Sequence, residues 1–348
     1  MVERNWLVLT DGWLMSRNAK TAHGVLRYGR DPIAAVLDTE HQGHDLSSVM
    51  PSLERAAPIV GSVSEGIDAG ATSLLLGVAT PGGWIPDHWR PLLKEALEAS
   101  MEIANGLHGF LGDDPELVEL AERHGGRLWD VRKPPDGIPL NSGLALQVPQ
   151  RIVGTVGSDC AVGKMTVSLE LTEVARAKGW SPEFIATGQT GILIAGKGIA
   201  VDRVISDFVS GAAEQLVVDA DERSDILLVE GQGGLWHPAY SGVTLGLLHG
   251  SAPEVLVLVH RAGREAIEEP PYTKLPPLDH VVRTYEDIAS WVRPCKVACV
   301  ALNCGGMSAE EASSHIQAAE ELTGLPAGDV WRGDAEKLWA AVEEALSR

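Results

Sequence analysis

The chain has 348 residues, enough for two domains that each bury a core. It carries 28 Lys and Arg against 48 Asp and Glu, a formal net charge of −20, so we expect neither nucleic acid nor an anionic membrane as a partner. A small anionic substrate remains compatible with this charge, because a pocket can be locally basic. No apolar run reaches about 18 residues and no apolar leader is evident, so we expect a cytoplasmic protein without a membrane span.

The first half of the chain alternates predicted strands and helices. Strands are predicted at 5–10, 32–38, 72–80 and 127–132, and helices at 62–70, 86–107 and 113–126. This alternation is typical of a parallel sheet with helices on both faces. The segment 133–145 is rich in Pro and Gly and lacks periodicity, which indicates a domain boundary.

The alternation restarts at Arg151. Strands are predicted at 151–156, 183–187, 226–229, 255–259 and 297–302, and helices at 164–178, 203–219 and 333–347. The sequence therefore predicts two α/β domains, at 1–140 and 141–348.

The most informative motif joins the first strand of the second domain to its first helix. It is a glycine-rich turn that ends in Gly163-Lys164, and its backbone N–H groups, the helix N-terminus and the lysine would converge on a phosphate. Five residues separate Gly157 from Gly163, one more than usual, and Met165 stands where Ser or Thr is common. The nearest hydroxyl is that of Thr166. The predicted cofactor-binding residues of this loop are Gly157, Ser158, Asp159, Cys160, Ala161, Val162, Gly163, Lys164, Met165 and Thr166.

The predicted fold class is therefore α/β, with an N-terminal Rossmann-like parallel sheet domain and a C-terminal P-loop NTPase-like doubly wound domain.

Further polar positions of interest belong to the second domain. Glu230 ends an apolar strand, and in phosphate-loop proteins such a carboxylate reaches the metal shell. With Thr166 and Asp207 it forms a candidate magnesium site; the alternatives are an exposed strand end for Glu230 and a helix cap for Asp207 or Asp202. Asn303 is a candidate cofactor contact, because its amide can pair with a purine edge, or it simply forms a turn.

The four cysteines form no C-x-x-C pair, which favours reduced thiols. Cys295, Cys299 and Cys304 crowd one strand-like segment, where packing as small apolar groups is favoured over metal binding. Cys160 lies in the phosphate loop, where the helix N-terminus can activate a thiol, so a nucleophilic role is a further possibility.

Candidate substrate contacts cluster after the first strand of the chain. Lys20, His23 and Arg27 could bind a carboxylate or phosphate, and His23 and Arg27 share a face if that segment is helical; a solvated loop is the alternative. Gln189 is a further substrate-binding candidate. His108 joins Glu230 as a candidate catalytic proton acceptor.

The second-domain motifs carry a family resemblance. Gly-x5-Gly-Lys, followed by a strand that ends in Glu-Gly-x-Gly-Gly, is similar to dethiobiotin synthetase and the cobyrinic-acid amidotransferase group. The resemblance implies that Lys164 binds phosphate and that Glu230, a loop hydroxyl and an Asp hold Mg²⁺, although Met165 departs from it. In the first domain, the glycine-rich end at 77–83 looks weakly like the CoA-binding half of succinyl-CoA synthetase.

A second resemblance covers nearly the whole chain. The matching stretches are 20–24 with Arg27-Tyr28, 77–83, 105–117, 157–166, 187–191 and 229–234. They resemble a two-domain bacterial and archaeal family, long described as a domain of unknown function, whose members were later assigned as D-glutamate N-acetyltransferases. The resemblance implies acetyl-CoA as the acetyl donor and an acidic amino acid as the small-molecule substrate.

Three functions follow as hypotheses. The first is an acetyltransferase in which the phosphate loop holds CoA and Arg27 clamps a substrate carboxylate. The second is an ATP- and Mg²⁺-dependent enzyme that activates a carboxylate, in which Lys164, Thr166 and Glu230 take their usual roles. The third is a nucleotide-binding regulator without turnover. For each of them we expect a homo-oligomer, as compact enzymes of this kind often are.

Overall fold

The computed structural model describes residues 3–347, which group into two compact units. Unit 1 comprises residues up to Pro134 together with Gln189–Ala200, and unit 2 comprises Pro135–Gly188 and Val201 onward. The break at 134 falls in the Pro- and Gly-rich segment in which the sequence places the boundary. The assignment of Gln189–Ala200 to unit 1 has no counterpart in the sequence-based division at residue 140.

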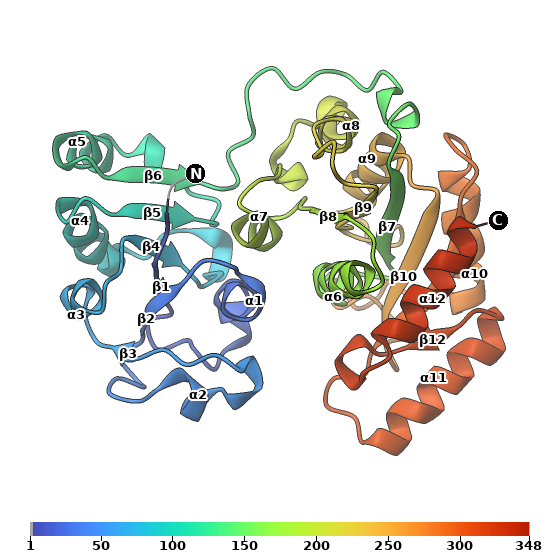
Figure 1. Cartoon of the computed structure of the whole chain (residues 1–348), viewed down its shortest axis with the longest axis horizontal. Coiled ribbons are helices and arrows are strands. Elements are labelled where there is room, and N and C mark those ends of the chain that lie inside the picture. The colour runs from blue at the N-terminus through green and yellow to red at the C-terminus, as the bar shows by residue number, and fades with distance from the viewer. Residues whose placement is uncertain (1–2, 348) are drawn as a thin grey trace. The chain divides into compact units, whose positions relative to one another are not determined.

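Unit 1 is built on a six-stranded parallel sheet (Figure 1). Its strands are β1 (Trp6–Leu9), β2 (Ile33–Leu37), β3 (Ile59–Val60), β4 (Ser73–Leu76), β5 (Glu102–Asn105) and β6 (Arg127–Asp130). The spatial order is β3-β2-β1-β4-β5-β6, so the chain proceeds in one direction from β1 and in the other from β4. The Rossmann-like fold class is confirmed. The place where the order reverses is where open α/β sheets bind ligands.

Six α-helices accompany this sheet in the described part of unit 1. They are α1 (Lys20–Tyr28), α2 (Leu46–Val49), α3 (Val63–Asp68), α4 (Arg90–Glu98), α5 (Pro115–His124) and α7 (Gln189–Ala195). The best-capped of them is α5, where the Asp114 side chain accepts from the N–H groups of Glu116 and Leu117 and Gly125 ends the helix at φ +74°.

The helix predicted at 86–107 is wrong in its second half. Helix α4 ends at Glu98, Ser100 turns the chain at φ +62°, and β5 begins at Glu102. All four residues of β5 are buried between β4 and β6. Burial at the centre of a sheet therefore overrides the helical periodicity of the preceding residues.

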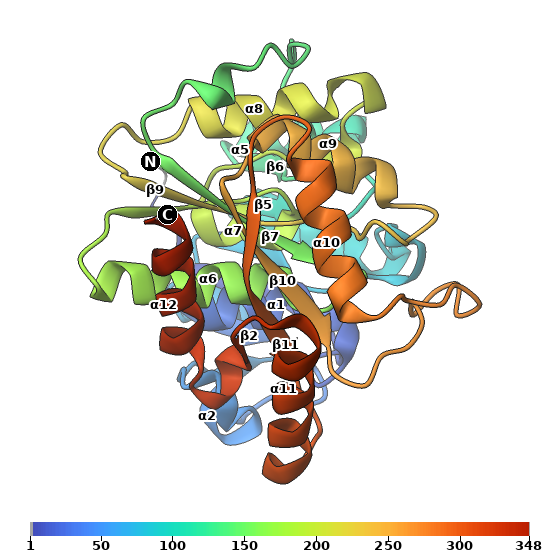
Figure 2. The same ribbon diagram turned by 90° about the vertical axis from the view of Figure 1, so that its right-hand side faces the viewer.

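Unit 2 contains a second six-stranded parallel sheet (Figure 2). Its strands are β7 (Arg151–Gly157), β8 (Pro182–Ile185), β9 (Ile226–Val229), β10 (Val255–Arg261), β11 (Lys296–Asn303) and β12 (Ala327–Gly328). The order is β12-β11-β10-β7-β9-β8, so the strand that precedes the phosphate loop stands where the direction of winding changes. This confirms the doubly wound prediction.

Helices cover both faces of the second sheet. They are α6 (Lys164–Ala177), α8 (Val209–Val218), α9 (Ser241–Ser251), α10 (Leu278–Ala289), α11 (Ala309–Thr323) and α12 (Ala335–Leu346). Val255, Val257 and Val259 of β10 pack with α6 and α12, whereas Leu256 and Leu258 pack with α10 and α11. Each fully buried side chain of this kind stabilises the fold by about 1.5–3 kcal/mol.

Cys295, Cys299 and Cys304 are buried free thiols, which confirms the prediction that they pack as small apolar groups. Burial raises the pKa of the Cys299 thiol to about 12, so it stays protonated and inert at neutral pH. Across the described chain, no helix combines the length and apolarity needed to cross a membrane.

Candidate functional site

The phosphate loop leaves β7 at Gly157 and enters α6 at Lys164. Gly163 adopts φ +115° and Ala161 adopts φ +53°, left-handed conformations that turn the chain sharply into the helix. A 14-residue helix therefore points its N-terminus at the carboxyl end of the strand. The strand, turn and helix thus take the arrangement on which the sequence-based prediction of an anion site rests.

Lys164 lies across the loop instead of reaching out to solvent. Its Nζ donates to the carbonyl oxygens of Asp159 at 2.8 Å and Gly233 at 2.7 Å. Burial lowers the pKa of Lys164 to about 8, against the opposing effect of nearby negative groups. A bound phosphate would give this buried ammonium the counter-charge that two carbonyl oxygens supply only in part.

Two glycines leave room for close contacts at this point. A Cβ on Gly231 would lie 1.9 Å from the Thr155 carbonyl oxygen, and one on Gly157 would lie 2.8 Å from Lys164 Nζ. Neither contact is tolerable, so a side chain at either position would push the loop or the lysine out of place. Gly231 of the Glu-Gly-x-Gly-Gly motif is therefore needed for close backbone approach to β7, the strand that leads into the phosphate loop.

Glu230 follows β9 and is buried beside this loop. Its Oε2 accepts the N–H groups of Thr187 at 3.0 Å and Gly188 at 3.2 Å. Burial raises the pKa of Glu230 to about 7, and the charge of Asp202 also favours the protonated form, while the two N–H groups and Lys164 oppose the shift. Glu230 is therefore a carboxyl group that titrates near neutral pH beside the predicted phosphate site.

The other predicted magnesium ligands differ in exposure. Thr166 is half-buried in the first turn of α6, and Asp207 is exposed in the short helix η8 (Ser206–Phe208). The acidic group whose charge acts on Glu230 is Asp202. With Met165 offering sulfur in place of the usual hydroxyl, the side chains fit a hard cation less well than the loop fits a phosphate.

Asn303 braces the phosphate loop from β11. Its Nδ2 donates to the Val162 carbonyl oxygen at 3.1 Å, and its Oδ1 accepts the Gly305 N–H at 3.0 Å. The amide therefore fixes both the loop and its own turn. Its predicted contact with a cofactor remains a prediction.

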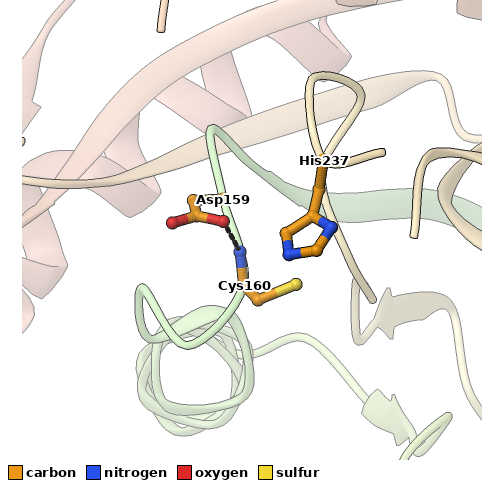
Figure 3. A group of neighbouring side chains, drawn as sticks. All are labelled: Asp159, Cys160 and His237. Carbon is orange, nitrogen blue, oxygen red and sulfur yellow. Dashed lines mark hydrogen bonds between the residues drawn. The ribbon is translucent and has the colours of Figure 1, made fainter. Parts of the chain in front are cut away.

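Asp159, Cys160 and His237 gather at the tip of the loop (Figure 3). A carboxylate oxygen, the Sγ atom and a ring nitrogen of these residues lie within 4.8 Å of one another. The Asp159 carboxylate is already engaged, because it accepts the Cys160 N–H at 2.7 Å and Arg264 Nη1 at 2.7 Å. Arg264 already balances the charge of the Asp159 carboxylate, so the three residues are poorly suited to hold a metal cation. His237 was missed in the sequence, where it belongs to no recognisable motif.

In unit 1, two of the candidate substrate-binding residues contact backbone carbonyl groups of nearby loops. His23 Nε2 lies 2.7 Å from the Leu14 carbonyl oxygen, and Arg27 Nη1 donates to the Ser52 carbonyl at 3.0 Å. Lys20 is exposed at the start of α1. These residues therefore share one helix, as the predicted spacing requires, while the two hydrogen bonds reach different loops.

His108 and Gln189 lie elsewhere in unit 1. The His108 N–H donates to the Gly83 carbonyl at 2.8 Å, and Gln189 Oε1 accepts from Arg132 Nη2 at 2.9 Å. The structure thus gathers the loop, Glu230 and Asn303 within unit 2, and it places the proposed substrate contacts in unit 1.

Comparison with known proteins covers both units. A family model described as a P-loop domain of unknown function, DUF1611_C, matches residues 139–339, and a Rossmann-like companion, DUF1611_N, matches residues 39–134. The crystal structure of a DUF1611 family protein from Anabaena variabilis is 41% identical, with a TM-score of 0.92, and covers 98% of this chain and 99% of that one.

Two curated relatives carry the name D-glutamate N-acetyltransferase. The protein from Tritonibacter scottomollicae is 36% identical over 92% of both chains. The protein from a Pseudoalteromonas species is 37% identical over 80% of this chain and 83% of its own. With both family models matched and these relatives aligned, the chain belongs to the DUF1611 family, with an N-terminal Rossmann-like domain and a C-terminal P-loop domain.

Proposed function

We propose that the protein is an N-acetyltransferase that moves the acetyl group of acetyl-CoA to the amine of D-glutamate or a related acidic D-amino acid. The observation that carries the proposal is the alignment, over 92% of both chains, with a relative named for that activity. Because both units are aligned, the proposal concerns the whole chain and not one domain of it.

The phosphate loop gives this activity a physical basis. CoA carries phosphates that match a helix N-terminus, the N–H groups of the loop and a buried lysine. Binding would exchange the carbonyl partners of Lys164 for an anion and hold the ammonium charged. Acyl transfer consumes no nucleotide triphosphate and needs no magnesium, so Met165 in place of a hydroxyl is no obstacle.

Proton transfer has two candidate acceptors from the sequence, Glu230 and His108. Glu230 titrates near pH 7, which suits a base at neutral pH. Glu230 borders the loop proposed for a phosphate, and His108 belongs to unit 1, so both stay candidates for the proton acceptor. No comparison favours the ATP-dependent ligase, and we do not propose it.

The test is an incubation of purified protein with D-glutamate and acetyl-CoA, with and without ATP and Mg²⁺, that follows free thiol and product mass. The proposal predicts thiol release and N-acetylglutamate in equal amounts, independent of ATP. The absence of product with acetyl-CoA, together with ADP formation when carboxylates and ATP are supplied, would replace it with the ligase.

A further inference from the structure

The site proposed so far leaves a second pocket unexplained. A pocket of about 240 Å³ lies in unit 1, and its lining includes Asp11, Trp13, Thr80, Trp84, His88 and Trp89. Asp11 and Trp13 follow β1, whereas Thr80 to Trp84 follow β4. These two strands are neighbours at the point where the strand order reverses, the usual ligand site of such sheets. The volume is below the range typical for drug-sized ligands, so it suits a small molecule and not a whole CoA.

The backbone around Asp11 is fixed by hydrogen bonds of the residues that follow it. Its backbone adopts φ +50°, an uncommon conformation for a residue other than glycine. The neighbouring N–H groups of Gly12 and Leu14 donate to the buried carboxylate of Asp38, at 2.9 and 3.2 Å, which fixes the loop in this conformation. The Asp11 side chain is thereby directed toward the residues after β4.

The pocket presents this carboxylate among aromatic rings. Asp11 Oδ2 accepts Trp89 Nε1 at 2.6 Å and lies 2.7 Å from His88 Nε2. Both contacts use Oδ2, so among the described residues Oδ1 stays available to a ligand. Trp84 also lines the pocket and is 69% exposed, so its ring is accessible to a ligand.

A carboxylate beside indole rings is suited to an ammonium group. The carboxylate supplies a charge-assisted hydrogen bond, and the indole rings of Trp13 and Trp84, which also line the pocket, can add cation–π attraction. Neither Lys nor Arg is among the lining residues, so the pocket offers a phosphate group no strongly cationic partner. It is thus complementary in charge to the anion site of unit 2.

We propose that this pocket binds the ammonium end of the amino-acid acceptor, with Asp11 Oδ1 as its hydrogen-bond partner and Trp13 and Trp84 on its sides. The identity of the acceptor rests on the proposed acetyltransferase activity. The assignment of an ammonium group to the pocket rests on the lining residues alone.

The test compares ligands and variants by isothermal titration calorimetry on the full chain. The ligands are D-glutamate and glutarate, which lacks the amine. The variants are Asp11→Asn, which tolerates the left-handed backbone, and Trp84→Ala; Asp68→Asn and Trp291→Ala, both at exposed positions, are the matched controls. Thermal unfolding confirms that each variant is folded.

We expect D-glutamate to bind the wild type and each pocket variant to bind it at least about tenfold more weakly, with the controls within about twofold. Glutarate should bind weakly to every form, and its affinity should be the same for the wild type and for Asp11→Asn. If D-glutamate is bound or acetylated equally well by wild type and both pocket variants, the pocket assignment is wrong and the acetyltransferase proposal stands.

Another outcome would support the ammonium pocket and contradict the proposed amino-acid acceptor. If D-glutamate is neither bound nor acetylated but ethylamine binds in an Asp11-dependent way, the ammonium pocket is supported and the proposed acceptor is wrong. If neither amine binds in an Asp11-dependent way, the ammonium assignment is overturned.

Discussion

The loops after β1 and β7 occupy equivalent places in the two sheets and are built in opposite ways. Each follows a strand at which the order of its sheet reverses. After β7 the site is made of glycine, backbone N–H groups and a buried lysine, which favour an anion. After β1 it is made of a carboxylate and indole rings, which favour a cation. The fold places each loop where open α/β sheets generally bind ligands, and the residues of the loop decide which charge it favours.

The largest effect on stability is expected at Gly231, where the backbone lies against the Thr155 carbonyl of β7. In Gly231→Ala the new methyl group would lie 1.9 Å from a backbone oxygen, so we expect a loss of about 4 kcal/mol in the free energy of unfolding. Urea unfolding measures it. The control is Gly242→Ala on α9, where nothing lies within 4 Å, and it should change stability by less than about 1 kcal/mol. Equal effects of the two substitutions would show that the close approach is not rigid.

A buried carboxyl group in unit 2 should lower stability at alkaline pH. The pKa of Glu230 is raised from 4.5 to about 7, so the folded state keeps a proton that the unfolded chain has lost between these values. The cost is absent below pH 4.5, grows up to about pH 7 and then reaches about 3 kcal/mol. Glu230→Gln should therefore raise the melting temperature at pH 8 and leave it unchanged near pH 4. A lower melting temperature at pH 8 would contradict this reading.

Asp38 should have the opposite pH dependence in unit 1. Its hydrogen bonds with His41, Thr10 and Leu14 lower its pKa against the effect of burial. The stabilisation is present above the unfolded value of 3.8 and is lost as pH falls through the lower folded value. Asp38→Asn should cost about 2 kcal/mol at pH 7 and progressively less in acid, as followed by thermal unfolding against the exposed Asp68→Asn. A cost that does not vary with pH would show that the charge is unimportant.

The smallest expected effect is the change in affinity for acetyl-CoA with pH. Because the pKa of Lys164 is lowered to about 8, the cation that binds phosphate is lost as pH rises above that value. Affinity for acetyl-CoA should fall by about tenfold per pH unit between 8.5 and 9.5, where the phosphate no longer titrates. Lys164→Arg, which stays charged, should give a flat profile. A flat profile in the wild type would remove Lys164 from the anion site.

The two loops also differ in how far sequence reveals them. The phosphate loop is local: strand, glycines, lysine and helix follow one another, so its spacing predicted the structure. The pocket after β1 joins Asp11 to His88 and Trp89, which lie 77 and 78 positions away, and no short motif records such a contact. His237 beside Cys160 escaped prediction for the same reason.

Errors in the predicted elements have a related cause. Strand β5 was read as helix because its residues are buried on all sides, and such a strand carries no alternation of polar and apolar residues. The helix α9 was not predicted at all, since Gly242, Gly246 and Gly250 interrupt its periodicity. Gly250 is needed there because a Cβ would lie 2.1 Å from the Ser210 carbonyl oxygen where α8 and α9 meet.

The most direct test of the account is calorimetric titration of acetyl-CoA into the wild type and Lys164→Ala. If the loop of unit 2 holds a CoA phosphate, the variant should bind about a hundredfold more weakly while remaining folded, because a charge-assisted contact to the phosphate is lost. Equal affinity of the two proteins would show that CoA binds elsewhere.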